Sequence, residues 1–196
     1  MLAMSINDQF RGELNVGERL IWSGQPHQGL LLRPADALMI PFSLLWGGFA
    51  VFWETTVLWA GAPTFFALWG IPFVLAGLYF IFGRFLVDIY QRKRIYYALT
   101  NERAIIISGM FTRNIKSLDL GKLPEINVST TRDGKGTITF GTSHPMGWFY
   151  SVGGWPNTGR YHVAPSFEMI GDVNSVYRSI KDVQRERSIP VASKAG

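Results

Sequence analysis

The side chains that most often carry out catalysis are few in this sequence and lie apart from one another. His27, His144 and His162 stand singly, the chain contains no cysteine, and no serine lies in a Gly-x-Ser-x-Gly elbow. Catalysis needs a nucleophile beside a base, paired carboxylates or a histidine cluster. We therefore expect a protein without catalytic residues, cofactor or bound metal, and an enzyme is the alternative.

Three ionisable residues, Glu54, Arg84 and Asp88, lie in or directly after the most apolar part of the chain. Between Ala37 and Gly83, Glu54 is the one charged residue. Ionisable side chains at membrane depth are candidates for function. All three would lie near the ends of the membrane-spanning helices that this stretch predicts, which favours anchoring at the membrane interface. A role in transport or catalysis is the alternative.

Glu54 divides this stretch into two segments, each long enough to cross a lipid bilayer. A hydrocarbon core about 30 Å thick is crossed by roughly 20 helical residues, and Ala37 to Thr56 and Phe65 to Leu86 supply two such spans. The sequence therefore predicts a transmembrane helical hairpin, and the alternative is a pair of buried helices in a soluble protein. Small residues on both segments would let the helices pack closely: Gly47, Gly48, Gly70 and Gly77.

Basic residues flank the hairpin only at its outer ends. The connector from Val57 to Thr64 has none, whereas Arg33 precedes the hairpin and Arg84 and the run Arg92, Lys93 and Arg94 follow it. The positive-inside rule then predicts a multi-pass membrane protein with both termini in the cytoplasm. We expect Arg92, Lys93 and Arg94 to contact anionic headgroups. The net charge of +5 does not indicate a nucleic-acid partner, because no nucleic-acid motif accompanies it.

The rest of the chain predicts an antiparallel β structure closed by one helix. Apolar runs bounded by turn residues predict strands over residues 19–23, 95–99, 103–108, 111–120, 126–131, 137–140 and 161–164. Asp133-Gly134 predicts a hairpin turn between two of them. From the N-cap Ser166 onward, an apolar face recurs at helical spacing: Phe167, Ile170, Val173, Tyr177, Ile180 and Val183. Residues 1–13 show no such pattern, and we expect them to be poorly ordered.

A connector from Gly141 to Arg160 is rich in glycine, proline and aromatic residues. It contains Trp148, Phe149, Tyr150 and Trp155. A loop packed on its own side chains is one interpretation. The other is a partner-binding or membrane-dipping surface, because exposed aromatic clusters mark such sites.

These patterns divide the chain into four parts. Residues 1–35 form an N-terminal segment with the first strand, and residues 36–88 form the transmembrane hairpin. Residues 89–187 form the folded domain, and residues 188–196 form a flexible tail rich in serine and alanine. The fold class is that of an α+β membrane protein.

Two motifs give this organisation a family resemblance. Tyr97-Ala98-Leu99-Thr100-Asn101-Glu102-Arg103 resembles the YxLTxxR signature of bacterial membrane proteins with a pleckstrin-homology-like (PH-like) domain, and so does Gly17-Glu18 leading to Trp22 ahead of two membrane helices. The resemblance implies a β-barrel or sandwich of about seven strands capped by a C-terminal amphipathic helix. Within the signature, we expect Arg103 to satisfy nearby carbonyls or a carboxylate, and a ligand-binding Arg103 is the alternative.

The resemblance also implies a membrane-anchored, non-enzymatic role. We expect an interaction or scaffolding module at the cytoplasmic face of the bacterial inner membrane, with the lipid bilayer and either a protein partner or a second copy of the chain as its contacts. One alternative is an accessory subunit of a membrane transport or envelope complex, in which the glycine faces dock on other membrane helices. A membrane-embedded enzyme is a further alternative.

Overall fold

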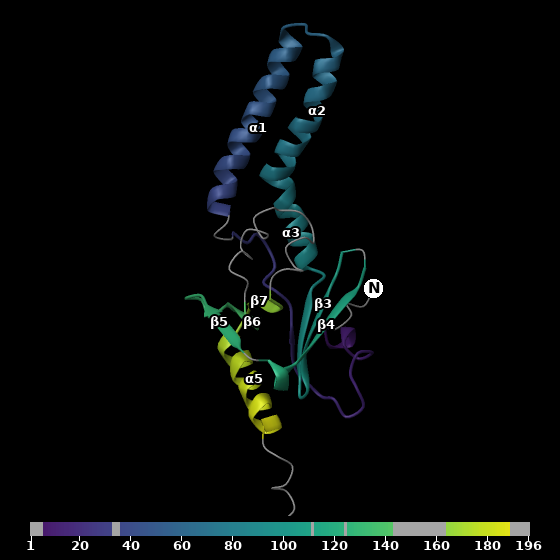
Figure 1. Cartoon of the computed structure of the whole chain (residues 1–196), viewed down its shortest axis with the longest axis vertical. Coiled ribbons are helices and arrows are strands. Elements are labelled where there is room, and N and C mark those ends of the chain that lie inside the picture. Colours follow the sequence, from purple (N-terminus) through teal and green to yellow (C-terminus); the bar gives the residue numbers. More distant parts are fainter. Residues whose placement is uncertain (1–5, 33–35, 111, 124, 143–163, 189–196) are drawn as a thin grey trace, which may run out of the picture. The chain divides into compact units, whose positions relative to one another are not determined.

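The computed structural model describes residues 6–32, 36–110, 112–123, 125–142 and 164–188. The described chain is α+β and divides into two compact units. One consists of residues 29–90 and is a helical hairpin. The other combines residues 6–28, 91–142 and 164–188 and holds all the described strands (Figure 1).

The hairpin unit is built from two apolar helical segments. Helix α1 (Asp36–Trp59) is followed by α2 (Thr64–Leu78), which continues through a π-helical turn, η2 (Tyr79–Gly83), into α3 (Arg84–Arg92). Both Asp36–Trp59 and Thr64–Arg92 are long and apolar enough to cross a membrane. A core helix of a soluble protein would be mostly buried, but only 17% and 11% of their most apolar windows are buried.

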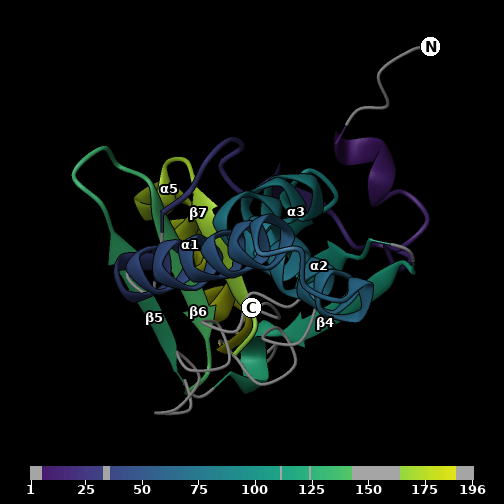
Figure 2. The same ribbon diagram turned by 90° about the horizontal axis from the view of Figure 1, so that it is seen from above.

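The strands of the other unit form two antiparallel sheets. The first sheet has the order β1-β2-β3-β4, with β1 (Leu20–Gly24), β2 (Tyr96–Thr100), β3 (Arg103–Ser108) and β4 (Asn114–Asp119). The second has the order β5-β6-β7, with β5 (Ile126–Thr130), β6 (Gly136–Phe140) and β7 (Ser166–Ile170). The sheets do not close into a barrel among the described residues. Two short helical turns, η1 (Ile6–Gln9) and η3 (Leu120–Lys122), and helix α5 (Val173–Ser188) complete the unit (Figure 2).

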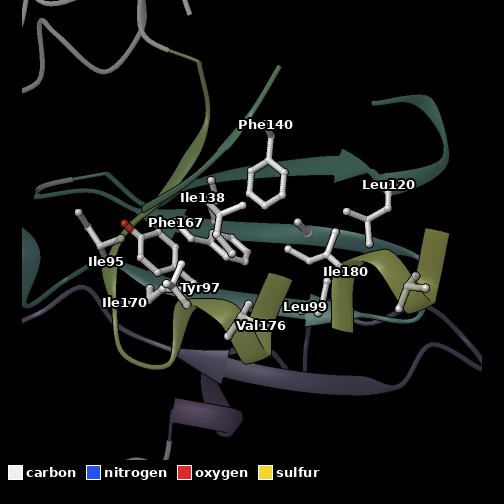
Figure 3. Close-up of a cluster of buried hydrophobic side chains, with 14 residues drawn as sticks. Ile95, Tyr97, Leu99, Leu120, Ile138, Phe140, Phe167, Ile170, Val176 and Ile180 are labelled. Carbon is white, nitrogen blue, oxygen red and sulfur yellow. The ribbon is translucent and has the colours of Figure 1, made fainter. Parts of the chain in front are cut away.

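One hydrophobic core joins both sheets and α5. The Phe167 ring of β7 stacks on Tyr97 of β2 with a centroid distance of 4.8 Å, and it meets Phe140 of β6 edge-on at 4.9 Å (Figure 3). Val176 and Ile180 bring the apolar face of α5 into the same cluster. The predicted Asp133-Gly134 turn joins β5 to β6, and Gly134 has the positive φ of +75° that glycine tolerates.

The N-terminal segment covers the other face of the first sheet. Phe10 is completely buried against Ala98, Ile105 and Ile107. The expectation that residues 1–13 are poorly ordered is therefore wrong for the described residues 6–13. A single aromatic residue gives no periodic signal, so the sequence pattern could not reveal this contact.

The predicted start of the last helix is also wrong. Ser166–Ile170 is strand β7, and α5 begins only at Val173. An irregularity in the pairing of β6 with β7 sets Gly136 opposite Ile170 and Ile138 opposite Phe167, so the two inward residues of β7 are three apart. That spacing imitates a helix. The predicted strand over residues 161–164 and the tail over residues 189–196 lie outside the described residues.

Candidate functional site

The hairpin is inserted between two neighbouring strands of one sheet. Strand β1 ends at Gly24, which pairs with Tyr97 of β2, so the chain leaves and re-enters the sheet at adjacent positions. We call residues 25–28 and 91–95 the neck. Within the neck, Arg92 Nη1 donates a hydrogen bond to His27 O at 2.9 Å, and Gln25 Nε2 donates one to Lys93 O at 3.3 Å.

The basic run at the neck does not lie wholly on the surface. The Arg92 side chain is 1% exposed and holds the neck together through its hydrogen bond to His27 O, so its contact with a headgroup stays a prediction that this burial does not favour. Lys93 and Arg94 are exposed, and Arg94 Nη1 also donates to Met110 O at 2.8 Å. Contact of these two residues with lipid stays a prediction.

Three polar residues of the two motifs form a cluster that we call the clasp, in which Glu18 and Thr100 are buried and Arg103 is partly buried. Glu18 Oε1 accepts hydrogen bonds from Arg103 Nε at 2.9 Å and from Thr100 Oγ1 at 2.7 Å. Glu18 Oε2 accepts from Arg103 Nη2 at 3.0 Å and from the Asn15 amide at 2.8 Å. Arg103 Nη2 also donates to Glu13 O at 2.7 Å. Arg103 therefore binds a carboxylate and a carbonyl, as the sequence predicted.

The turn between β2 and β3 extends the clasp through the backbone. Asn101 Oδ1 accepts from the Arg19 amide at 2.7 Å, and the Asn101 amide donates to Arg19 O at 3.1 Å. The Thr100 hydroxyl accepts from the amides of Glu102 and Arg103. Both halves of the resemblance, Gly17-Glu18 and the YxLTxxR-type run, thus meet in one structural cluster.

The electrostatics of the clasp follow from these contacts. Burial by itself would raise the pKa of the Glu18 carboxyl, whose side chain has no exposed surface. The hydrogen bonds from Arg103, Asn15 and Thr100, together with the Arg103 charge, outweigh burial and lower that pKa to about 2. The same hydrogen bond with Glu18 raises the pKa of the Arg103 guanidinium. The pair stays charged at neutral pH and suits a structural role better than proton transfer.

A second ion pair joins the two ends of the hairpin. Arg84 Nη1 lies 2.9 Å from Asp36 Oδ1, and both side chains are largely buried. The Arg84 guanidinium lies over the ring of Phe85, 4.4 Å from its centroid. Asp88 is partly buried one turn further along α3. The structure thus places Arg84, a candidate residue of the sequence, beside Asp36 at the start of α1.

Glu54 lies where α1 meets α2. Its Oε2 atom is buried, finds no hydrogen-bond partner in the described part of the chain, and occupies the space that a side chain at Gly70 would need. Further along the same face, a Cβ atom on Gly77 would lie 2.8 Å from Gly47 Cα. The prediction that glycines allow close helix packing is confirmed for Gly47, Gly70 and Gly77. Gly48 instead faces open space.

Several predicted features remain outside this description. Trp148, Phe149, Tyr150 and Trp155 lie outside the described residues. Within the described ranges, no group of three or more His, Asp or Glu side chains could hold a metal ion.

Comparisons with known proteins do not assign the chain to a family. No model of a known protein family matches this chain, and no curated protein or solved structure does so either.

Proposed function

We propose that the chain is a membrane-anchored, non-enzymatic interaction module with a PH-like fold, held at the cytoplasmic face of the bacterial inner membrane. The hairpin anchors it, and the unit that holds the strands meets the leaflet and a protein partner or a second copy of the chain. The observation that carries this proposal is the apolar surface of the hairpin.

The apolar surface of the hairpin is too large to be exposed to water in a soluble monomer. Large hydrophobic side chains are exposed along both helices, among them Leu38, Leu45, Phe49, Phe52, Leu58, Phe65, Leu68, Leu75 and Phe82. A soluble monomer rarely exposes a contiguous apolar patch beyond a few hundred Å². In hydrocarbon, each Leu, Ile, Phe or Val favours insertion by about 0.3–0.6 kcal/mol at the helix centre. A lipid bilayer is therefore the solvent that suits these helices.

The PH-like assignment is supported by element order and by the clasp. The resemblance implies about seven strands followed by a C-terminal helix, and the described residues have seven strands, in sheets of four and three, followed by α5. The signature residues hold β1 to the β2–β3 turn across the inserted hairpin. This gives the signature a structural reason that does not require a ligand at Arg103.

An accessory subunit of a larger membrane complex is the second candidate function. The positions of the glycines do not favour a subunit that docks on other membrane helices through its glycine faces. Three of the four glycines that could dock on another helix face the inside of the hairpin, and only Gly48 faces outward. Docking through these glycines would separate α1 from α2. An interaction module that meets its partner outside the bilayer needs no such change.

Single-cysteine labelling tests the topology, because the natural chain contains no cysteine. Ala60→Cys places a thiol in the exposed connector between α1 and α2, and Asn174→Cys places one on the exposed face of α5. In spheroplasts, a membrane-impermeant maleimide should label Ala60→Cys directly and Asn174→Cys only after permeabilisation. Direct labelling of both positions, or of Asn174→Cys alone, would contradict the proposed orientation.

Partner binding has its own test. Replacing Trp148 and Trp155 by alanine should abolish cross-linking to a partner in intact membranes while the protein still fractionates with the membrane. An unchanged set of cross-linked proteins would contradict a partner surface at these residues.

A further inference from the structure

The Arg84 side chain has hydrogen-bond donors that no described residue of the chain uses. It is 9% exposed, and its Nη1 atom is engaged by Asp36 at 2.9 Å. Its Nε and Nη2 atoms are buried and have no hydrogen-bond partner among the residues that the structure describes. Buried donors of a charged group are costly when unsatisfied, because the group has lost its water without gaining an acceptor. Arg84 is thus a cation with two donors still available.

The two available atoms are the pair that recognises an oxyanion. Nε–H and the adjacent Nη2–H point in the same direction from one edge of the planar guanidinium, and such a fork matches two oxygens of a phosphate or carboxylate. The Phe85 ring lies against the face of the guanidinium, with its centroid 4.4 Å from the central carbon. The edge that carries Nε and Nη2 takes no part in this ring contact.

The position of Arg84 along its helix indicates which oxyanion it meets. The helix Thr64–Arg92 has 29 residues, about 43 Å at 1.5 Å per residue. A hydrocarbon core needs only about 20 residues, so a crossing that starts at Thr64 ends at about Gly83. Arg84 is then the first residue on the headgroup side. Asp36, its partner, is the first residue of α1, whose positive dipole end favours an anion at the same level.

We propose that the Asp36–Arg84 pair forms a phosphate-binding site, in which the Nε–Nη2 edge of Arg84 binds the phosphate of a phospholipid headgroup or a free phosphate. The proposal rests on the membrane anchoring proposed above, because the depth of Arg84 depends on it. Asp36 holds the guanidinium in position through Nη1 and leaves the other edge for the ligand. Its negative charge weakens the attraction for the anion, so binding is selective for the fork geometry rather than for charge alone.

The test uses the full chain, solubilised in a neutral detergent, with phosphatidylglycerol as the probe. Native mass spectrometry measures the apparent dissociation constant. Arg84→Lys keeps the charge and the attraction to Asp36 but has no planar fork, and we expect binding to weaken at least about tenfold, which is about 1.4 kcal/mol. Arg178→Lys, on the exposed face of α5, is the matched control and should leave the constant unchanged. Equal binding by wild type and Arg84→Lys would overturn the proposal.

A second variant should change the affinity for phosphatidylglycerol in the opposite direction. Asp36→Asn removes the competing negative charge and keeps an oxygen that can accept from Nη1, so phosphatidylglycerol should bind several-fold more tightly. A purely structural ion pair predicts lower stability and no tighter binding. If Arg84→Lys fails to fold, Asp36→Asn still tests the proposal. Binding of phosphatidylglycerol by Asp36→Asn that is weaker than or equal to that of wild type would overturn the proposal.

Two further arms separate the sources of the phosphate and the two proposals. Inorganic phosphate that competes with the lipid at millimolar concentration supports a site for free phosphate, and absence of competition supports the lipid headgroup. Diacylglycerol, which lacks phosphate, should show no dependence on Arg84, and an equal dependence would overturn the proposal. Membrane fractionation of Arg84→Lys keeps the two proposals apart: a variant that stays in the membrane and binds lipid like wild type removes only the phosphate site.

Discussion

Arg103 and Glu18 lie 85 residues apart in the chain and share two hydrogen bonds, from Nε to Oε1 at 2.9 Å and from Nη2 to Oε2 at 3.0 Å. The whole hairpin lies between them in sequence. Through this contact the segment before β1 is fixed to the turn between β2 and β3. The two pieces of the strand-bearing unit, which the hairpin separates in sequence, are therefore joined by a bidentate ion pair.

Removal of the Glu18 charge should destabilise this unit. Glu18→Gln leaves the partly buried Arg103 without its anion, and we expect a loss of about 2 kcal/mol in the free energy of unfolding, since hydrogen bonds to charged groups contribute about 1.5–3 kcal/mol. Urea unfolding of the detergent-solubilised chain measures the change. Glu13→Gln is the matched control, because Glu13 pairs with the half-exposed Arg113 at 3.2 Å. Exposed pairs contribute about 0–1 kcal/mol, so equal losses for both variants would contradict the role of the clasp.

The clasp also sets an acid dependence of stability. The pKa of Glu18 falls from 4.5 to about 2 on folding, so the ionised carboxylate stabilises the fold above pH 4.5. This contribution, up to about 3 kcal/mol, is lost as the pH falls from 4.5 toward 2. Urea midpoints between pH 6 and pH 2.5 should therefore fall more steeply for wild type than for Glu18→Gln. Parallel curves for the two proteins would show that Glu18 does not have a lowered pKa.

Phe10 should prove to be a core residue. It is completely buried against β2 and β3, and truncation of a buried Phe to Ala costs about 3–5 kcal/mol. Phe10→Ala should lower the urea midpoint strongly, whereas Val16→Ala should not, because Val16 is fully exposed. A Phe10→Ala variant as stable as wild type would mean that the N-terminal segment does not pack on the sheet.

The glycines of the hairpin offer a matched comparison. Gly77→Ala places a methyl group 2.8 Å from Gly47 Cα, where only a shift of the backbone can make room, and Gly70→Ala collides with the Glu54 carboxylate. Overpacking against the backbone, as at Gly77, costs about 1–3 kcal/mol. The end of the Glu54 side chain can move, so Gly70→Ala should cost less. Gly48→Ala meets open space and should be neutral. Thermal unfolding in detergent measures all three, and a Gly48→Ala variant as unstable as Gly77→Ala would contradict the observed helix pairing.

Periodic features of the fold could be predicted from the sequence. The two apolar spans, the strand pair Tyr96–Thr100 and Arg103–Ser108, and the turn at Gly134 follow from hydrophobic patterning and turn chemistry, which are local properties. The start of α5 could not be predicted, because the irregular pairing of β7 spaces Phe167 and Ile170 as a helix would.

The contacts at the candidate sites could not be predicted, because each of them joins residues that are distant in sequence. Arg92 stands in a basic run that looks like a surface cluster, but its partner His27 O lies 65 residues away. Arg84 and Asp36 were separate charges in the sequence, and only the antiparallel helices bring them together. Local patterns identify candidate residues well, and they do not show which of them meet.

Membrane fractionation tests the central claim most directly. Cells that express the full chain are lysed without detergent, the membranes are washed with alkaline carbonate, and the pellet and supernatant are separated by ultracentrifugation. The account predicts that the protein stays in the pellet and is released only by detergent. Recovery of folded protein in the supernatant would contradict the account, because the apolar faces of α1 and α2 would then be covered by something other than lipid.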